Sequence, residues 1–460
     1  MLFVVALLLC CAAAAMAPSP PAAIQRQVPS PPVTTVTPEQ FGARADGHQD
    51  DTSAVRAAVA SCARHAAACR VLFAAEKTYL CGPFIVASSG VTLDIRGKIV
   101  ALPRVEGCES KAGCYPRSGA AQSEFPSFLT ADGVSDLTLQ GGGHIDGRGE
   151  PWWPCKHSGC WRPHLLNFSS VTRLAVRDIA LVDSPNHFVR VNNCTHVRVE
   201  RVRMTAPHTS PNTDGINFAG GADQLLSNCT IHNGDDCVSV ITYGPGAGSS
   251  SFAVPCQSQP QLCRGGNVLI EDLVCDGGHG ASIGSVRHGL ISNVTFRRVK
   301  LLAGPTQTLD SGGGCRVKSY PNGSGSVSNI RYEDIDIAGV AYPLQILAAY
   351  CPKSQKPWPC PPGDGAVNVH DISFARIRGF GKTAQVGSFD CGIVPCTGIS
   401  LSDVQLTAPS GGAPRFECSN CSGTASNTSP PSCFKSDDEP RAETDHAAKY
   451  AHPSLSLALR

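Results

Sequence analysis

Val171-Thr-Arg-Leu-Ala-Val-Arg-Asp-Ile179 alternates apolar and polar residues, and the same phrase returns as Thr195-His-Val-Arg-Val-Glu-Arg-Val-Arg203. Each copy places apolar residues at every second position before a turn of mixed polarity. Further copies of the phrase begin at Val134, Asn267, Ile291, Val327, Val367 and Thr397. The period of two predicts β-strands, and the repetition along the chain predicts a solenoid.

Strands that restart at the length of one coil, with irregular insertions in the larger gaps, indicate an all-β protein with the architecture of a right-handed parallel β-helix. A β-sandwich would also contain short alternating strands, but it would not repeat this phrase at solenoid spacing. The 46 Gly and 35 Pro, which follow no collagen period, are typical of a turn-rich β protein. A hydrophobic fraction of 42% provides enough apolar side chains for a large core.

The folded region is predicted to open at Phe41-Gly-Ala-Arg-Ala-Asp-Gly47. Asp50-Asp51-Thr52 is predicted to cap an Ala-rich helix that runs to about His65 and covers the end of the core. We expect the β-helix domain to span residues 39–407. Residues 408–460, rich in Cys, Ser and Pro, are expected to form a disulfide-tied and partly disordered tail.

Residues 1–17 form an apolar run that ends in small residues and is predicted to be a cleaved signal peptide. An uncleaved membrane anchor is the alternative, although the run is short for a bilayer span. Residues 18–38 are Pro-rich and are predicted to be an extended linker. We therefore expect a secreted protein of the extracellular space or cell wall, with no membrane contact after cleavage.

The chain has 23 Cys, of which two lie in the predicted signal peptide and 21 remain. This number predicts disulfides formed in an oxidising compartment, with at least one cysteine left without a partner in the chain. Zinc binding by Cys418-Ser-Asn-Cys421 is a weaker interpretation. Sequons for N-glycosylation begin at Asn167, Asn193, Asn228, Asn293, Asn322, Asn420 and Asn427.

Four short motifs bring acidic, basic and histidine residues into one part of the chain. They are Asn212-Thr-Asp-Gly215, Gly234-Asp-Asp-Cys237, Gly278-His-Gly280 and Arg316-Val-Lys318. Asp214 and Asp235 lie 21 residues apart, which is close to one coil. Residues one coil apart lie on adjacent strands, about 4.8 Å from each other. The spacing therefore places Asp214 beside Asp235 and Asp236.

Three clustered carboxylates cannot ionise independently, so repulsion and partial burial should raise the pKa of at least one. A retained proton beside a carboxylate base is what glycoside hydrolysis requires. Arg316 and Lys318 are two residues apart, so on a strand both point outward while Val317 points inward. A net charge of +1 excludes bulk attraction to polyanions such as nucleic acid, so an acidic ligand must be recognised by such local cations.

In their order, the four motifs resemble those of glycoside hydrolase family 28, the polygalacturonases. This resemblance implies inverting hydrolysis with Asp235 as the acid, while Asp214 and Asp236 position the water. It implies that His279 tunes the acid or contacts the sugar, and it also implies a disulfide between Cys237 and Cys275. Substrate-binding roles are implied for Asn212, Arg316, Lys318 and Tyr350.

The sequence thus predicts a pectin hydrolase that cleaves α-1,4-galacturonosyl links as a monomer and uses no cofactor or metal. Endo action is favoured over exo action, although an insertion at residues 244–266 could close one end of the cleft. Rhamnogalacturonan or xylogalacturonan are alternative substrates. A Ca²⁺-dependent pectate lyase and a non-catalytic wall-binding β-helix are less favoured, because all three aspartates are present. The Asp235-Asp236 pair could also bind Ca²⁺ through its hard oxygen ligands.

Overall fold

The computed structural model describes residues 33–64, 68–105, 113–117, 125–158, 160–242, 263–305, 313–351, 366–409 and 412–434. The predicted signal peptide, residues 18–32 of the linker, residues 244–262 of the insertion and the tail after residue 434 lie outside these residues. In the part of the chain that is described, no helix has the length and apolar character needed to cross a membrane.

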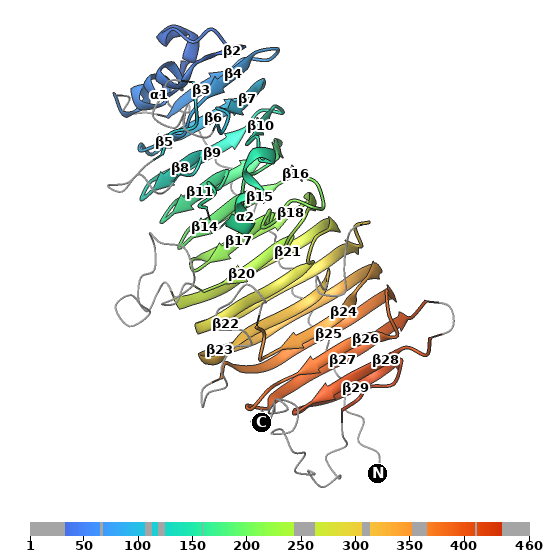
Figure 1. Cartoon of the computed structure of the whole chain (residues 1–460). Coiled ribbons are helices and arrows are strands. Elements are labelled where there is room, and N and C mark those ends of the chain that lie inside the picture. Colours follow the sequence, from blue (N-terminus) through green and yellow to red (C-terminus); the bar gives the residue numbers. More distant parts are fainter. Residues whose placement is uncertain are drawn as a thin grey trace, which may run out of the picture. The chain divides into compact units, whose positions relative to one another are not determined.

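The described residues between 33 and 434 form a right-handed parallel β-helix, which confirms the predicted fold class (Figure 1). Every strand pairs in parallel with the corresponding strand of the next coil, and the pairings follow three tracks, named here sheets 1, 2 and 3. The long strands β21, β22, β23, β25 and β27 run around coil corners, so that some of them contribute to more than one sheet.

Sheet 1 carries the residues of the four motifs. Its strands are β5 (Phe84–Val86), β8 (Leu129–Asp132), β11 (Leu166–Ser169), β14 (Val189–Asn192), β17 (Ile216–Ala219), β20 (Val238–Ile241), the first parts of β22 (Ala281–Leu302) and β23 (Gly313–Val340), β24 (Tyr342–Leu347), β26 (Gln385–Asp390) and β28 (Arg415–Ser419).

Sheet 2 carries the repeated phrase. It consists of β1 (Thr34–Val36), β3 (Cys69–Phe73), β6 (Val91–Ile95), β9 (Ser135–Gln140), β12 (Thr172–Arg177), β15 (Thr195–Glu200), β18 (Ala222–Ser227), the first part of β21 (Arg264–Gly277), the middle of β22 and β23, β25 (Asn368–Gly381), β27 (Cys396–Thr407) and β29 (Cys421–Ser429).

Sheet 3 leads back to sheet 1 through the turns that hold the site. It consists of β2 (Asp46–Asp50), β4 (Thr78–Cys81), β7 (Lys98–Ala101), β10 (His144–Asp146), β13 (Ala180–Val182), β16 (Arg203–Thr205), β19 (Thr230–Asn233) and the last parts of the long strands.

The core follows from the alternation in the phrase. In sheet 2, Leu174 pairs with Val197 and Val176 with Val199, and all four side chains are buried. Aromatic residues in equivalent positions stack along the axis: the ring centroids of Phe296 and Tyr332 lie 4.8 Å apart. Burial of such ladders stabilises each coil only when the next coil covers it.

The corners of sheet 2 explain the polar residues within the phrase. A residue near the start of several copies adopts a positive φ, as in Asp136, His196 and Asn293. Asn and Asp tolerate this left-handed conformation better than other non-glycine residues, because their short side chains hydrogen-bond locally. Paired corner residues of successive coils also contact each other, as in the ion pair between Arg173 and Asp136.

The predicted N-terminal helix is present as α1 (Thr52–Ser61), and Val55 and Val59 bury its apolar side in the core. A 3-10 turn, η2 (Cys62–Arg64), follows it. The capping differs from the expectation: Asp51 occupies the N-cap position but its carboxylate accepts hydrogen bonds from the backbone of Arg44 and Ala45. The remaining short helices are η1 (Pro38–Phe41), η3 (Glu150–Trp152) and α2 (Cys155–Ser158).

The β-helix extends beyond both predicted boundaries. Thr34–Val36 of the expected linker forms β1, which pairs with β3. After residue 407, β28 and β29 add strands to sheets 1 and 2, so the expected tail continues the solenoid to Ser429. Cys418 forms a disulfide with Cys433, which removes it from the possible zinc motif.

Disulfides join five pairs of described cysteines: Cys62–Cys69, Cys155–Cys160, Cys237–Cys275, Cys391–Cys396 and Cys418–Cys433. Five described cysteines form no disulfide, namely Cys81, Cys194, Cys229, Cys315 and Cys421.

The aromatic stack generates a stability prediction. Phe374 is fully buried against Tyr332, so Phe374→Ala should lower the free energy of unfolding by about 3–5 kcal/mol. Phe380 on the same strand is 47% exposed, and Phe380→Ala is the matched control, expected to cost less than about 1 kcal/mol. Guanidinium titration followed by circular dichroism measures both. Equal losses in the two variants would contradict the stacked core.

Candidate active site

Three successive turns between sheets 3 and 1 bring the acidic motifs together. Asp214 ends the turn before β17, Asp235 and Asp236 occupy the turn before β20, and His279 precedes β22. Backbone hydrogen bonds join these turns, because Gly215 N–H donates to Asp236 O and His279 N–H donates to Asp235 O, both at 2.9 Å. The register of the strands therefore places all four side chains side by side, as the one-coil spacing predicted.

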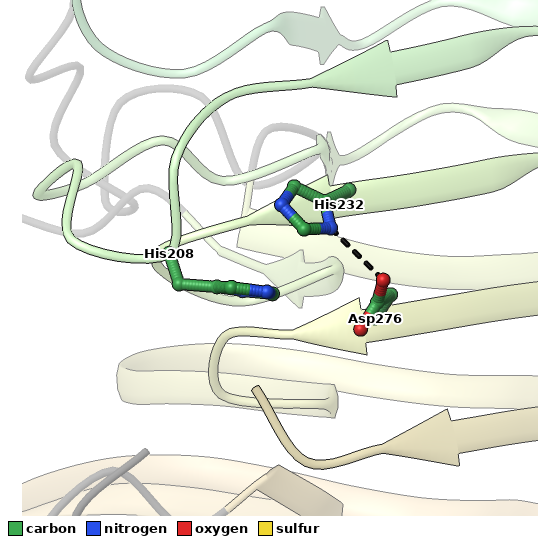
Figure 2. Close-up of side chains that lie close together, drawn as sticks. All are labelled: His208, His232 and Asp276. Atoms are coloured by element: carbon green, nitrogen blue, oxygen red, sulfur yellow. Dashed lines mark hydrogen bonds and ion pairs between the residues drawn. The ribbon is translucent and has the colours of Figure 1, made fainter. Parts of the chain in front are cut away.

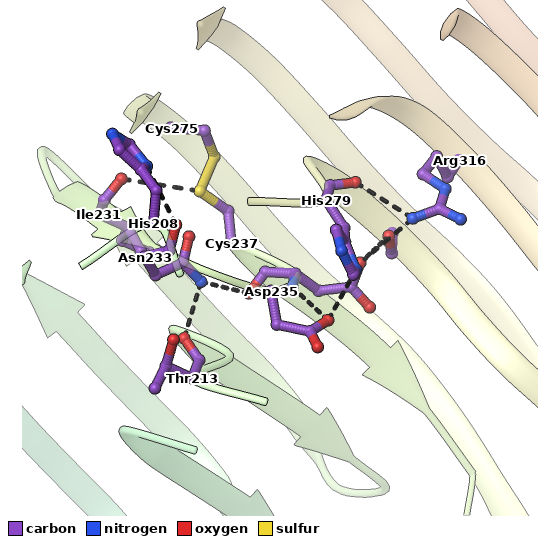
Figure 3. Close-up of a disulfide and its surroundings, with 11 residues drawn as sticks. His208, Thr213, Ile231, Asn233, Asp235, Cys237, Cys275, His279 and Arg316 are labelled. Carbon is purple, nitrogen blue, oxygen red and sulfur yellow. Dashed lines mark hydrogen bonds and ion pairs between the residues drawn. A yellow bond between two sulfur atoms is a disulfide. The ribbon is translucent and has the colours of Figure 1, made fainter. Parts of the chain in front are cut away.

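Gly234 is needed because its position has no room for a side chain, and not because its backbone adopts a positive φ. A Cβ atom at this position would lie 2.1 Å from the carbonyl oxygen of Ser210. The close approach of these two turns brings Asp235 onto the same side as Asp214. Behind the turn, the implied disulfide between Cys237 and Cys275 is present (Figure 3).

Asp236 is held by two buried cations. Lys318 Nζ donates a hydrogen bond to Asp236 Oδ2 at 2.8 Å, and Ser282 Oγ donates to Asp236 Oδ1 at 2.7 Å. Arg316 lies 3.7 Å from the same carboxylate. Arg316 and Lys318 share one side of β23 and Val317 points into the core, as predicted. The two cations do not lie on an open surface, because their side chains are 4% and 6% exposed and already contact Asp236; their contact with substrate stays a prediction.

Asp235 is paired with His279. His279 Nδ1 lies 2.9 Å from Asp235 Oδ1 (Figure 3). Asn212 Nδ2 donates to Asp235 Oδ2 at 3.3 Å. Burial alone would raise the pKa of Asp235, but the charge and hydrogen bond of His279, with the charge of Lys318, hold this pKa well below its usual range. Asp235 is therefore ionised in the free protein, where it contacts His279.

Asp214 has the opposite electrostatic environment. Burial raises its pKa well above the usual range, and the charges of Asp235 and Asp236 raise it further. Its Oδ2 accepts a hydrogen bond from Asn217 at 3.0 Å. The cluster thus holds a proton on Asp214 and an anion on Asp235, which shows that the three carboxylates do not ionise independently.

The structure adds a basic and aromatic flank that the motif analysis missed. His187 Nε2 lies 3.6 Å from Asp214, and burial reinforced by Arg190 lowers the pKa of His187 to about 3. Arg162 and Lys156 both donate to Asn212 Oδ1 at 2.6 Å. Arg190 lies one coil before Asn217 in the register, so counting one coil back from the Asn-Thr-Asp-Gly motif could have found it.

Tyr350 lies on the opposite flank, beyond β24. Its ring centroid is 5.6 Å from Lys318 Nζ and 6.2 Å from the ring of Tyr320. Arg287 in turn lies over Tyr320 at 4.5 Å. All eight predicted site residues thus lie in one contiguous region, with Asn212 at one end and Tyr350 at the other.

One oxygen of Asp235, one of Asp236 and a nitrogen of His279 lie within 4.8 Å of one another, so their atoms are close enough to hold a cation. Asp236 is already neutralised by Lys318 and Arg316, and Asp235 by His279. A metal ion would have to displace these contacts, so the donor set suits proton transfer better than Ca²⁺ binding.

Residues 75–430 match the sequence profile described as glycosyl hydrolases family 28. The chain belongs to this family. It is 30% identical to a polygalacturonase of Cryptomeria japonica over 91% of this chain and 76% of that protein. It is 29% identical to a polygalacturonase of Malus domestica over 88% of this chain and 80% of that protein.

Solved structures with the same fold include an endo-xylogalacturonan hydrolase from Aspergillus tubingensis. It has a TM-score of 0.64 and 21% identity, and the match covers 86% of this chain and 100% of the other. A polygalacturonase from Erwinia carotovora has a TM-score of 0.57 and 22% identity, over 87% of this chain and 99% of that structure. At this identity the two structures support the β-helix fold alone.

The raised pKa of Asp214 generates a stability prediction with a defined sign. The folded pKa lies above the unfolded value of about 3.9, so ionisation at pH 7 favours the unfolded chain. Asp214→Asn removes this cost and keeps an oxygen acceptor for Asn217, so its melting temperature should exceed that of the wild type by ~2–4 °C at pH 7.

The difference should shrink at pH 3, where Asp214 is protonated in both states. Asp136→Asn is the control, because Asp136 is exposed and its pKa is lowered by Arg173. Differential scanning calorimetry at both pH values gives the measurement. A lower melting temperature for Asp214→Asn at pH 7 would contradict the assignment of the proton.

Proposed function

We propose that the protein is a secreted polygalacturonase that hydrolyses α-1,4-galacturonosyl links of pectin with inversion of configuration. The observation that carries the proposal is the cluster of Asp214, Asp235 and Asp236, linked to His279 and to two buried cations. Its membership of glycosyl hydrolase family 28 and its polygalacturonase relatives support the reaction class. An acidic polysaccharide fits the basic residues that flank the carboxylates.

The proton needed for the leaving group comes from the Asp235–His279 pair. An ion pair at 2.9 Å is favoured while water reaches it, and the side chains are 17% and 31% exposed. A sugar bound against the pair removes this water and favours the neutral partners, so the Nδ1 proton of His279 passes to Asp235. Asp235 then protonates the glycosidic oxygen as the bond to the anomeric carbon breaks.

The attacking water is activated by Asp236. Lys318 and Ser282 fix the orientation of this carboxylate, so it can accept the water proton while the water oxygen attacks the anomeric carbon. Asp214, with its retained proton, orients the same water. One oxygen of Asp235 and one of Asp236 lie within 4.8 Å of each other, which is closer than the about 6.5–9.5 Å usual between acid and base in inverting enzymes, so the proposal of inversion rests on the family and not on this spacing. The reaction needs no cofactor in this scheme.

Endo action is favoured by cations on both flanks of the carboxylates. Lys156 is exposed and reaches Asn212 on one flank, while Arg287 and the tyrosines lie on the other. A polyanion can therefore contact the protein on both sides of the cut. We infer a monomeric extracellular enzyme, since each chain contains the whole set of carboxylates.

The reaction class is tested with polygalacturonic acid in the presence of a chelator. The wild type should release reducing ends without ultraviolet absorbance, and Asp235→Asn should reduce kcat by at least ~10³-fold, because the proposed general acid is lost. Asp334→Asn, at the corner between sheets 2 and 3 of β23, is the control and should keep full activity. Absorbance that requires Ca²⁺ would instead indicate a lyase.

The substrate is tested by offering the enzyme three polysaccharides separately: polygalacturonic acid, rhamnogalacturonan and xylogalacturonan. Release of reducing ends from rhamnogalacturonan or xylogalacturonan, but not from polygalacturonic acid, would contradict the proposed substrate and keep the hydrolase. Absence of cleavage on all three would contradict the enzyme and favour wall binding.

Endo action predicts a rapid fall in viscosity and oligomers of mixed length. Lys156→Met should raise KM on long chains by ~2–5-fold, the loss expected for one exposed charge contact, with kcat nearly unchanged. Lys300→Met is the matched control, because Lys300 is also exposed but lies in sheet 3. Monogalacturonate as the sole product from the first minutes would contradict endo action.

A further inference from the structure

We propose that His208, His232 and Asp276 form a binding site for a divalent transition-metal ion of the zinc class, outside the catalytic carboxylates. One ligand atom from each residue lies within 4.8 Å of the others, and all three side chains are partly exposed (Figure 2). Zinc accepts imidazole nitrogen and carboxylate oxygen as ligands, and three protein ligands with water complete its usual coordination.

The strand register of sheet 3 places two of the three proposed ligands, His232 and Asp276, next to each other. Thr205, His232 and Asp276 occupy paired positions on β16, β19 and β21. Their neighbours Ile231 and Cys275 are buried, so His232 and Asp276 point outward from the same side of the sheet. His232 Nδ1 lies 2.9 Å from Asp276 Oδ2. This contact is a hydrogen bond in the metal-free protein, and a bound ion would replace it; unlike Asp236, neither residue has a buried lysine against it among the described residues.

His208 is held in place by local contacts. Its ring centroid lies 3.9 Å from that of His232, and its Nδ1 lies 3.3 Å from the carbonyl oxygen of Asn233. A carbonyl oxygen only accepts, so Nδ1 carries the proton and Nε2 keeps the lone pair that a metal needs. A backbone carbonyl on the second nitrogen is the usual way in which a metal-binding histidine is oriented.

Two glycines make room for the ring. A Cβ atom at Gly277 would lie 1.9 Å from His208 Nδ1, and one at Gly304 would lie 2.7 Å from the same atom. Any side chain at these positions would displace His208 from the cluster. The ring is therefore seated against the backbone of the second and third coils after its own.

Each ligand begins a segment that ends in a catalytic group. His208 is followed by Asp214, His232 by Asp235, and Asp276 by His279, in three stacked turns. An ion bound by the three ligands would cross-link these turns where they leave sheet 3. We expect metal binding to raise the thermal stability of the protein and to oppose separation of the catalytic turns.

The test is isothermal titration of ZnCl₂ into the full chain, prepared metal-free and without an affinity tag. The wild type should bind one zinc per chain at this site and melt at a higher temperature with zinc, but not with MgCl₂. His232→Ala and Asp276→Asn should each weaken this binding at least tenfold and abolish the melting shift. Cobalt(II) should give visible absorption bands in the wild type that both variants lose.

Two further variants decide where the ion binds. His196→Ala is the matched control, because His196 forms a similar exposed pair with Asp223 at 2.6 Å and should leave zinc affinity unchanged. Asp235→Asn should also leave it unchanged. Zinc affinity that survives in both His232→Ala and Asp276→Asn, or that is lost in Asp235→Asn, would overturn the site, and so would absence of binding. Zinc binding is measured without substrate, so a protein that fails to bind zinc could still hydrolyse pectin, and the two proposals are tested separately.

Discussion

The parallel hydrogen bonding between successive coils is the constraint on which the rest of the structure depends. It fixes neighbouring coils about 4.8 Å apart and aligns equivalent residues into rows. Buried rows such as Phe296, Tyr332 and Phe374 form the core. The same alignment stacks the turns between sheets 3 and 1. Functional groups that are one coil apart in sequence therefore become neighbours without any long-range packing of separate domains.

This stacking has an electrostatic consequence at the site. Three carboxylates in adjacent turns would repel one another if all were ionised, and the structure resolves the conflict unequally. Asp236 faces Lys318 and Arg316, Asp235 faces His279, and Asp214 is left with a raised pKa. The cluster is thus a set of groups in different protonation states, with the retained proton on Asp214; in the proposed mechanism the acid Asp235 receives its proton from His279 only when substrate binds.

Much of the fold was predictable because the phrase at Val171–Ile179 records both the strand period and the coil corner. The parts of the fold that were not predicted also have a physical reason. β28 and β29 were not predicted, because the stretch Cys421–Ser429 has no apolar alternation and is identified as a strand by its pairing with β27. Within the site, Asp214, Asp235, Asp236 and His279 were predictable from contiguous motifs and coil spacing. The contact of His187 with Asp214 and the burial of Lys318 depend on turn lengths and packing, which sequence spacing does not encode.

The central claim is that Asp235 and Asp236 act from opposite sides of one glycosidic bond, with water between base and sugar. Proton nuclear magnetic resonance of the first products of oligogalacturonate hydrolysis tests it most directly. The account predicts that the newly formed reducing end appears first as the β-anomer and then mutarotates. An α-anomer formed first would mean retention through a covalent intermediate, and an unsaturated product would mean elimination; either result would contradict the account.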